Sequence, residues 1–242
     1  MIQNRFFLIC CYIFTFNFAF ANATDSIPNK YGLYVSSTLS EYNQQVKQSI
    51  RNEMVDIHSI IPDMIFDLKY CTKDNFAKQI LYPKTKTSYI RYPAAMGLMK
   101  VQAELKKQNL SLKIWDAYRP YSITEMMWDL IGDARYVANP KFGSGHNRGI
   151  AVDLTIVSLN DKKELDMGTA FDNFTDTAHP DFKFLSETAL QNRKLLRSLM
   201  EQNGFKVFDT EWWHYYITDG HYEVLDLSFK QLAESAKSKN QH

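Results

Sequence analysis

The sequence predicts an α+β fold in which helices pack on a mostly antiparallel sheet. Segments with the pattern of buried strands alternate with segments of helical periodicity, and the last strands lie next to turns rather than long crossovers. Of the 242 residues, 45% are apolar and 23% are charged, which is an ordinary globular composition and excludes a disordered chain. No linker or shift in composition divides the chain after its N-terminal segment, so we expect a single domain.

The first half of this domain is predicted to contain two strands and two helices. Apolar residues crowd together at 64–68 and indicate a buried strand. Pro93 can begin a helix, because its missing N–H falls in the first turn, where no intrahelical partner is needed. Residues 110–117 alternate in polarity and predict a strand that Pro120 ends, and a short helix is expected at 121–131.

The second half is predicted to contain a strand, a long helix and a last strand. Residues 151–159 are rich in branched side chains, which favour a strand. Ser186 is a suitable N-cap for a helix that runs to Asn203, and Gly204 is a typical terminator. The last strong strand is expected at 213–218.

The first 23 residues have the layout of a secretory signal peptide. Arg5 precedes an apolar run, and small residues with A-x-A spacing place cleavage after Ala21 or Ala23. We therefore expect an exported protein, periplasmic or secreted, with no stable membrane span after signal removal. The alternative is a transmembrane anchor, because the uncharged stretch is near the lower length limit for a span. Residues 24–54 are interpreted as an N-terminal extension.

Two residues in the segment 144–153 have the character of metal ligands. His146 lies on a loop bounded by glycines, and Asp153 lies within an apolar strand. An ionised aspartate is costly to bury there unless a positive charge meets it, and a divalent metal would meet that need. Taken alone, His146 could be a surface histidine and Asp153 could pair with Arg148 or Arg119.

A second cluster lies in the aromatic segment 211–216, where Glu211 and His214 are three residues apart. Residues at this spacing face opposite sides of a regular strand, so both reach one site only if Glu211 lies in the preceding turn or a bulge intervenes. With His146 and Asp153, His214 would give zinc two nitrogens and one oxygen. Such a set leaves a fourth position for water, as catalytic zinc sites require. Taken alone, His214 could be a core histidine.

At these residues the sequence resembles the zinc D-alanyl-D-alanine dipeptidases, the VanX-like branch of the M15 metallopeptidases. The pattern S-x-H-x-x-G-x-A-x-D is matched from Ser144 to Asp153, and E-x-W-H is matched from Glu211 to His214. The resemblance extends over about residues 55–227. Three further segments are typical of the branch: D-L-K-Y at 67–70, D-A-Y-R-P at 116–120 and M-G-T-A-F-D at 167–172.

This resemblance implies a zinc peptidase domain over residues 55–242 that hydrolyses the free-amino dipeptide D-alanyl-D-alanine to two D-alanines, in connection with cell-wall peptide metabolism. It implies one Zn²⁺ per chain, a catalytic base, an arginine facing the transition state and a site for the substrate amino group. The zinc ligands fall on His146, Asp153 and His214, the base on Glu211, the arginine on Arg119, the amino-group site on Tyr70 and Asp172, and a further position near the substrate on Ser144.

Two other functions remain open at this point. A D,D-carboxypeptidase acting on peptidoglycan stem peptides would share the zinc, the base and the arginine, but would not need Asp172 to bind an amino group. A catalytically silent module could keep the fold and the zinc for peptidoglycan binding. The net charge of +1, from 28 basic and 27 acidic residues, gives no support to a nucleic-acid partner. The oligomeric state is not predicted.

Overall fold

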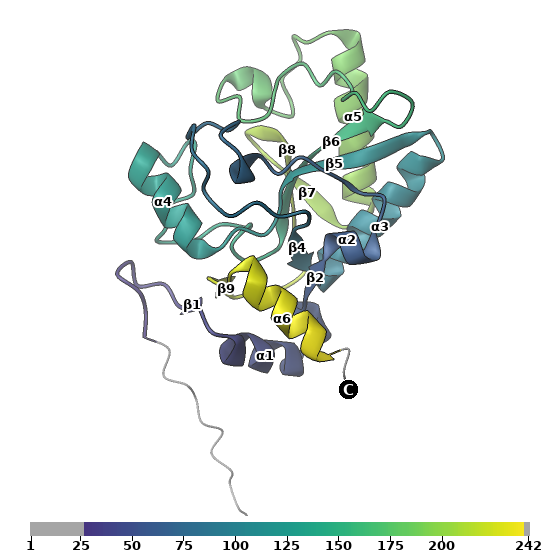
Figure 1. Cartoon of the computed structure of the whole chain (residues 1–242). Coiled ribbons are helices and arrows are strands. Elements are labelled where there is room, and N and C mark those ends of the chain that lie inside the picture. The colour runs from purple at the N-terminus through teal and green to yellow at the C-terminus, as the bar shows by residue number, and fades with distance from the viewer. Residues whose placement is uncertain (1–26, 240–242) are drawn as a thin grey trace, which may run out of the picture.

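A five-stranded sheet forms the centre of the computed structural model, which describes residues 27–239 (Figure 1). Its strands lie in the order β3 (Ile65–Phe66), β5 (Leu110–Asp116), β6 (Ala151–Ser158), β8 (Glu211–Ile217) and β7 (Phe205–Phe208). β3 runs parallel to β5, and every other neighbouring pair in this sheet is antiparallel. The predicted α+β fold with a mostly antiparallel sheet is therefore confirmed.

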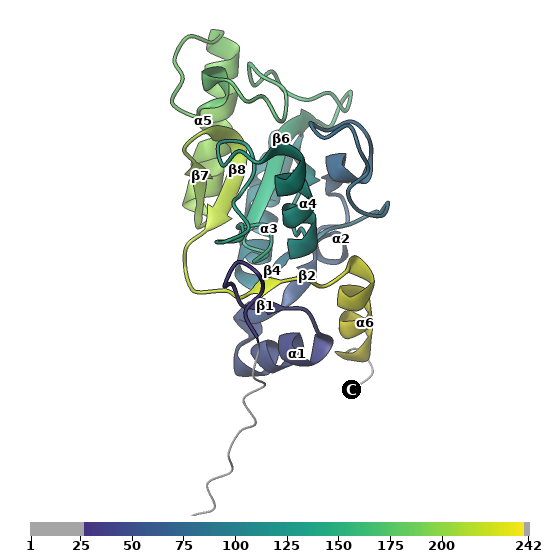
Figure 2. The same cartoon turned by 90° about the vertical axis from the view of Figure 1, so that its left-hand side faces the viewer.

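Helices cover both sides of this sheet. α3 (Tyr92–Lys106) and α5 (Glu187–Gln202) pack on one face, and α4 (Tyr121–Ile131) lies on the opposite side, as Figures 1 and 2 show together. The predicted N-cap is confirmed, because the Ser186 hydroxyl accepts a hydrogen bond from the Ala189 backbone N–H. The apolar stripe of α3 faces inward, where its leucines and valine are completely buried.

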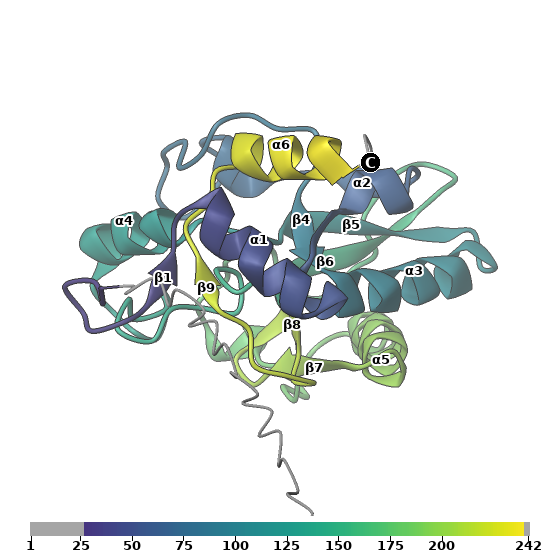
Figure 3. The same ribbon diagram turned by 90° about the horizontal axis from the view of Figure 1, so that it is seen from below.

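The extension before residue 55 packs against the C-terminal segment. β1 (Val35–Ser36) pairs in parallel with β9 (Val224–Leu225), and α1 (Leu39–Gln48) lies beside α6 (Phe229–Lys239) at the base of the molecule (Figure 3). The buried Tyr42 hydroxyl accepts a hydrogen bond from the Met54 backbone N–H. The first and last described segments thus form a second small core beneath the sheet.

The remaining elements are short. β2 (Met54–Asp56) pairs antiparallel with β4 (Tyr89–Arg91), and four short helical turns lie at separate places along the described chain. These turns are α2 (Ile57–Ile60), η1 (Ile50–Asn52), η2 (Lys69–Cys71) and η3 (Asp176–Ala178). No helix within residues 27–239 is long and apolar enough to cross a membrane. The signal peptide predicted for residues 1–23 lies outside the described residues.

Two irregularities in strand register shape the face of the sheet towards α4. Between β5 and β6 the register shifts at Trp115, which brings Asp116 opposite Asp153. Between β7 and β8 it shifts by three residues, so that Phe208 pairs with Glu211. Bulges of this kind turn side chains away from strict alternation. The last strand therefore begins two residues earlier than expected, and a bulge lies where the sequence analysis required a bulge or a turn.

Candidate metal centre and active site

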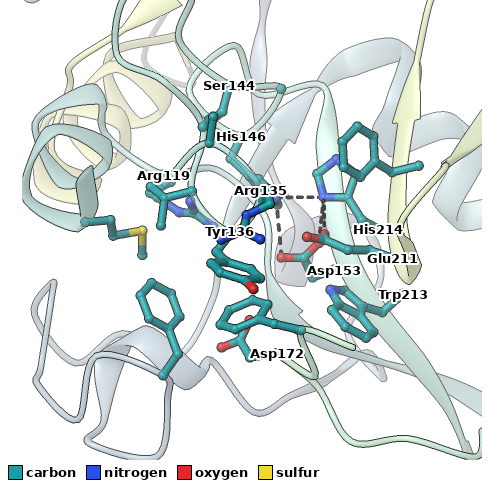
Figure 4. Close-up of a pocket in the computed structure, with 18 of the residues that line it drawn as sticks. Arg119, Arg135, Tyr136, Ser144, His146, Asp153, Asp172, Glu211, Trp213 and His214 are labelled. Carbon is teal, nitrogen blue, oxygen red and sulfur yellow. Dashed lines mark hydrogen bonds and ion pairs between the residues drawn. The ribbon is translucent and has the colours of Figure 1, made fainter. Parts of the chain in front are cut away.

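A cavity of about 290 Å³ lies between α4 and the part of the sheet formed by β6 and β8 (Figure 4). This volume is near the lower end of the range for small-molecule sites. Every residue that the sequence analysis assigned to the site lines this one cavity, although the residues come from six separate segments. They are Tyr70, Arg119, Ser144, His146, Asp153, Asp172, Glu211 and His214.

Three potential metal ligands converge in the cavity. His214 Nδ1 is 2.9 Å from Asp153 Oδ1 and 3.2 Å from His146 Nε2. His146 Nε2 is 3.3 Å from Asp153 Oδ2, and the ligand atoms of the group all lie within 4.8 Å of one another. Ligands about 2.0 Å from a tetrahedral zinc ion lie roughly 3.3 Å apart. The spacing of these two imidazoles and one carboxylate therefore fits a zinc ion.

The tautomer of His146 also suits metal binding. Its Nδ1 lies 2.7 Å from the backbone carbonyl of Ala117, which can only accept a hydrogen bond. Nδ1 therefore carries the proton, and the Nε2 lone pair is left for a cation in the cavity. The ring is buried and cannot turn freely in this position. This contact excludes the alternative that His146 is a surface histidine.

Among the described residues, no arginine forms an ion pair with Asp153. The Arg148 guanidinium donates to the backbone carbonyls of Tyr222 and Phe142, and Arg119 donates to Asp116. Although burial favours the neutral form of Asp153, the neighbouring histidines outweigh this effect and hold the pKa of its carboxyl below the ordinary value. The carboxylate is therefore ionised and directed at the histidines, as a metal ligand must be.

The β8 bulge places Glu211 on the same side as His214. Glu211 Oε2 lies 3.7 Å from His214 Nδ1, at the edge of the ligand group. Burial raises the pKa of the Glu211 carboxyl to about 7, with Asp153 and Asp172 adding to the rise and His214 opposing it. A carboxyl with a pKa near neutrality can both accept and return a proton, which suits a general base.

Arg119 is held in place by a buried carboxylate. Its Nε and Nη2 donate to Asp116 Oδ2 at 3.0 and 2.6 Å, and Asp116 Oδ1 accepts from the Tyr82 hydroxyl at 2.7 Å. The guanidinium also lies over the Tyr70 ring, 4.9 Å from its centroid. Although burial lowers the pKa of Arg119, Asp116 outweighs it and the net shift is upward. The arginine is thus a fixed, permanently charged group in the cavity wall.

The carboxylate of Asp172 lies beside the Tyr70 hydroxyl, at distances of 3.2 and 3.4 Å to its two oxygens. Burial and the nearby Asp153 raise the pKa of Asp172 to about 7, while Arg119 and Tyr70 oppose the rise. Its backbone has φ = +56°, in the left-handed region that costs a non-glycine residue energy. Within residues 27–239 no ion pair involves this carboxylate, which is directed into the cavity and is suited to receive a positive group (Figure 4).

Two positioning residues were not assigned a role from the sequence. Asp116 is one, because its place inside D-A-Y-R-P gave no sign that it would hold Arg119. Asn147 is the other: it is completely buried, and its Nδ2 donates to the Arg119 carbonyl and the Thr124 hydroxyl, both at 2.9 Å. Its Oδ1 accepts from the Ser144 backbone N–H at 3.0 Å. The available signal was proximity in sequence, since Asp116 is three residues before Arg119 and Asn147 follows His146 directly.

Comparison with known proteins places this site in a family. The model of the M15 peptidases, described as D-ala-D-ala dipeptidase, matches residues 50–232. The chain belongs to this family. It is therefore a metallopeptidase, and the recognised resemblance is confirmed.

Curated relatives cover most of the chain. The D-alanyl-D-alanine dipeptidase of Escherichia coli is 34% identical over 163 residues, which are 67% of this chain and 83% of that protein. The D-alanyl-D-alanine dipeptidase of Enterococcus faecium is 31% identical over 189 residues, with 69% and 92% covered. Among solved structures, the LdcB LD-carboxypeptidase aligns with a TM-score of 0.41 and 21% identity, over 78% of this chain and 73% of that one.

Proposed function

We propose that this metallopeptidase is a zinc-dependent dipeptidase that hydrolyses D-alanyl-D-alanine with a free amino group to two D-alanines. One observation carries the proposal: the Tyr70–Asp172 pair lies in the same small cavity as the ligand group and Glu211. An acidic site for an ammonium group at this place measures the substrate from its N-terminus. The family description and the names of the relatives support the same substrate.

One zinc ion per chain would be held by His146, Asp153 and His214. Bound there, zinc supplies Lewis acidity, which lowers the pKa of water and polarises a carbonyl oxygen. Two neutral imidazoles and one carboxylate form a donor set that this ion prefers. The described residues of this site include no cysteine ligand, so the set is not that of a closed structural zinc site.

Glu211 is proposed to move the proton of the reaction. Its carboxylate accepts a proton from the water that attacks the peptide carbonyl carbon. When the carbon–nitrogen bond breaks, Glu211 returns this proton to the leaving amino group. A pKa of about 7 allows both steps near neutral pH. The same group thus acts first as a base and then as an acid.

Arg119 is proposed to stabilise the negative charge that develops on the carbonyl oxygen. Because Asp116 and the Tyr70 ring hold the guanidinium, no reorganisation is needed when that charge appears. Removing a donor of this kind typically lowers the rate by about 10²–10³-fold. Asp172 and the Tyr70 hydroxyl would bind the substrate ammonium, and Ser144 lies close enough to the cavity to contact the substrate.

The two alternatives are less well supported by the geometry. A D,D-carboxypeptidase has no use for a carboxylate that awaits an ammonium group at Asp172. A silent binding module has no use for a base whose pKa is raised to about 7 at Glu211. Export to the periplasm or the medium and a link to cell-wall peptides are part of the proposal and rest on the sequence of residues 1–23 and on the substrate.

The test is a comparison of substrates with and without a blocked amino group. Purified mature protein is incubated with D-Ala-D-Ala, L-Ala-L-Ala and N-acetyl-D-Ala-D-Ala, and released alanine is quantified with and without a chelator. The proposal expects cleavage of D-Ala-D-Ala alone, lost on chelation and restored by zinc. Equal or faster cleavage of the acetylated substrate would indicate a carboxypeptidase, and no cleavage of any substrate would indicate a binding module.

A further inference from the structure

The loop between β6 and α5 carries Asp172, and side chains outside the lining of the active-site cavity hold it in place. This loop spans residues 159–186 and lies at the top of the molecule beside α5 (Figure 1). Asp172 stands within it in a left-handed conformation, with φ = +56°. A strained residue of this kind keeps its position only if the surrounding structure fixes it.

One arginine on α5 bridges both sides of the loop segment that contains Asp172. Arg193 is 6% exposed, and its Nε donates to the Met167 carbonyl at 2.7 Å. On the other side of Asp172, Nη2 donates to the Thr177 carbonyl at 2.9 Å and Nη1 to the His179 carbonyl at 3.0 Å. The guanidinium thus ties the two ends of a thirteen-residue stretch, 167–179, to one helix.

A second contact ties the same loop to the strand that carries Glu211 and His214. The Trp212 indole Nε1 donates to the Thr169 hydroxyl at 2.7 Å, and the Arg193 guanidinium lies over the Trp212 ring, 5.5 Å from its centroid. Trp212 lies in the β8 bulge between Glu211 and His214. The position of Asp172 is therefore linked, through two buried side chains, to the strand that presents the base and one metal ligand.

We infer that Arg193 is a positioning residue for the ammonium site: it fixes the loop so that Asp172 lies at the correct distance from the ligand group. This inference rests on the proposed function of Asp172. The distance between an ammonium site and a reacting centre sets which peptide is cut, and a displacement of about 1 Å by a remote mutation can lower activity about 10²-fold. Arg193 is not among the residues that line the active-site cavity, so its proposed effect on the substrate is indirect.

The test is a double-mutant cycle between Arg193 and Asp172 in the zinc-loaded protein. R193Q removes the three donors, and R193K keeps the charge but cannot reach three carbonyls in a planar fork. The matched control is R197Q: Arg197 lies one turn along the same helix and pairs with Glu201 and with Asp181, an exposed loop residue outside the stretch 167–179. Steady-state kinetics with D-Ala-D-Ala, zinc content and thermal unfolding are measured for each variant.

The expected result is a KM for D-Ala-D-Ala that rises far more than kcat falls in R193Q and R193K, with about a 10²-fold loss in kcat/KM, unchanged zinc content and no such effect in R197Q. In the D172N background the same substitutions should lower kcat/KM less than threefold, because the group they position is already gone. If the R193Q or R193K substitution lowered kcat/KM by the same factor in the D172N background as in the wild type, the inference would be overturned. Arg193 would then have a general structural role.

A third variant keeps the cycle informative if both Arg193 variants fail to fold. T169V removes the half-buried hydroxyl that accepts from the Trp212 indole, without disturbing a buried charge. T169V should raise the KM for D-Ala-D-Ala, and this effect should be much smaller in the D172N background. A wild-type KM in T169V would count against loop positioning. A D172N single variant with unchanged kinetics would instead refute the proposed function, so the two failures are distinguishable.

Discussion

The ion pair between Arg119 and Asp116 allows the sharpest single prediction about catalysis. Replacing Asp116 with asparagine keeps the shape of the side chain but removes the charge that holds the guanidinium. Both residues are buried, with side-chain exposures of 8% and 0%, so solvent cannot replace the lost partner. The Tyr82 hydroxyl loses its charged acceptor as well. The substitution therefore leaves a buried, uncompensated cation in the wall of the active site.

The expected loss of stability follows from these contacts. Breaking a buried ion pair by removing one partner costs about 3–5 kcal/mol, and an asparagine that still accepts one hydrogen bond places D116N towards the lower end of that range. The expected loss of turnover is about 10²–10³-fold, because the guanidinium is no longer fixed where the negative charge develops. Zinc content should change little, since Asp116 Oδ2 is 3.6 Å from the nitrogen of His146 that faces away from the ligand group.

The assay combines urea unfolding of the zinc-loaded protein with steady-state kinetics on D-Ala-D-Ala. The single variants D116N and R119Q and the double variant are compared. We expect the double variant to be at least as stable as R119Q, because neither the Arg119 cation nor the Asp116 carboxylate is left buried without a partner. Its kcat should be reduced at least as much as that of the more impaired single variant. Wild-type kcat in D116N would refute the argument that Asp116 positions Arg119.

Three further predictions follow from the same site. E211Q should bind one zinc per chain and lose about 10²–10⁴-fold in kcat, and retention of near-normal turnover would remove Glu211 from the role of base. In the metal-free protein, the pKa of Asp172 is raised to about 7 in the folded state from an ordinary value of 3.8, so the folded state binds the proton more tightly. Stability should therefore fall as pH rises from about 4 to 7, and D172N should show a smaller fall, measured by urea unfolding across that range. The rings of Tyr136 and Phe174 are tilted against each other, with centroids 4.7 Å apart, and both line the active-site cavity and a second cavity. Y136A should join the two cavities and raise the rate with Ala-extended tripeptides relative to the dipeptide, whereas an unchanged ratio would show that this pair does not limit substrate length.

Much of the architecture was predictable because local signals agreed with the tertiary fold. The helix at 121–131 has the predicted bounds, and the Ser186 cap begins α5 where expected. β7 was not predicted, because its four residues include the exposed Lys206 and Phe208 and resemble a turn. Short strands of this kind are defined by their partner rather than by their own sequence.

The ligand group could be predicted from His146, Asp153 and His214 because each departs from what its local sequence would otherwise require. An aspartate inside an apolar strand is one such departure, and the structure shows the histidines that satisfy it. Register shifts could not be predicted in this way, because the three-residue bulge before Tyr215 depends on how two strands pair and not on the local sequence of either strand. The support of Arg119 by Asp116 likewise depends on side chains that only the assembled fold brings together. The signal peptide at residues 1–23 stays a prediction.

The most direct test of the account is the zinc content of the purified protein, measured by inductively coupled plasma mass spectrometry after dialysis. The account predicts one zinc per chain in the wild type and in E211Q. It predicts a large loss of zinc when Asp153 or His214 is replaced by alanine, with loss of dipeptide cleavage in parallel. A wild-type protein that cleaves D-Ala-D-Ala without bound metal, or a D153A variant that keeps full zinc content, would contradict it.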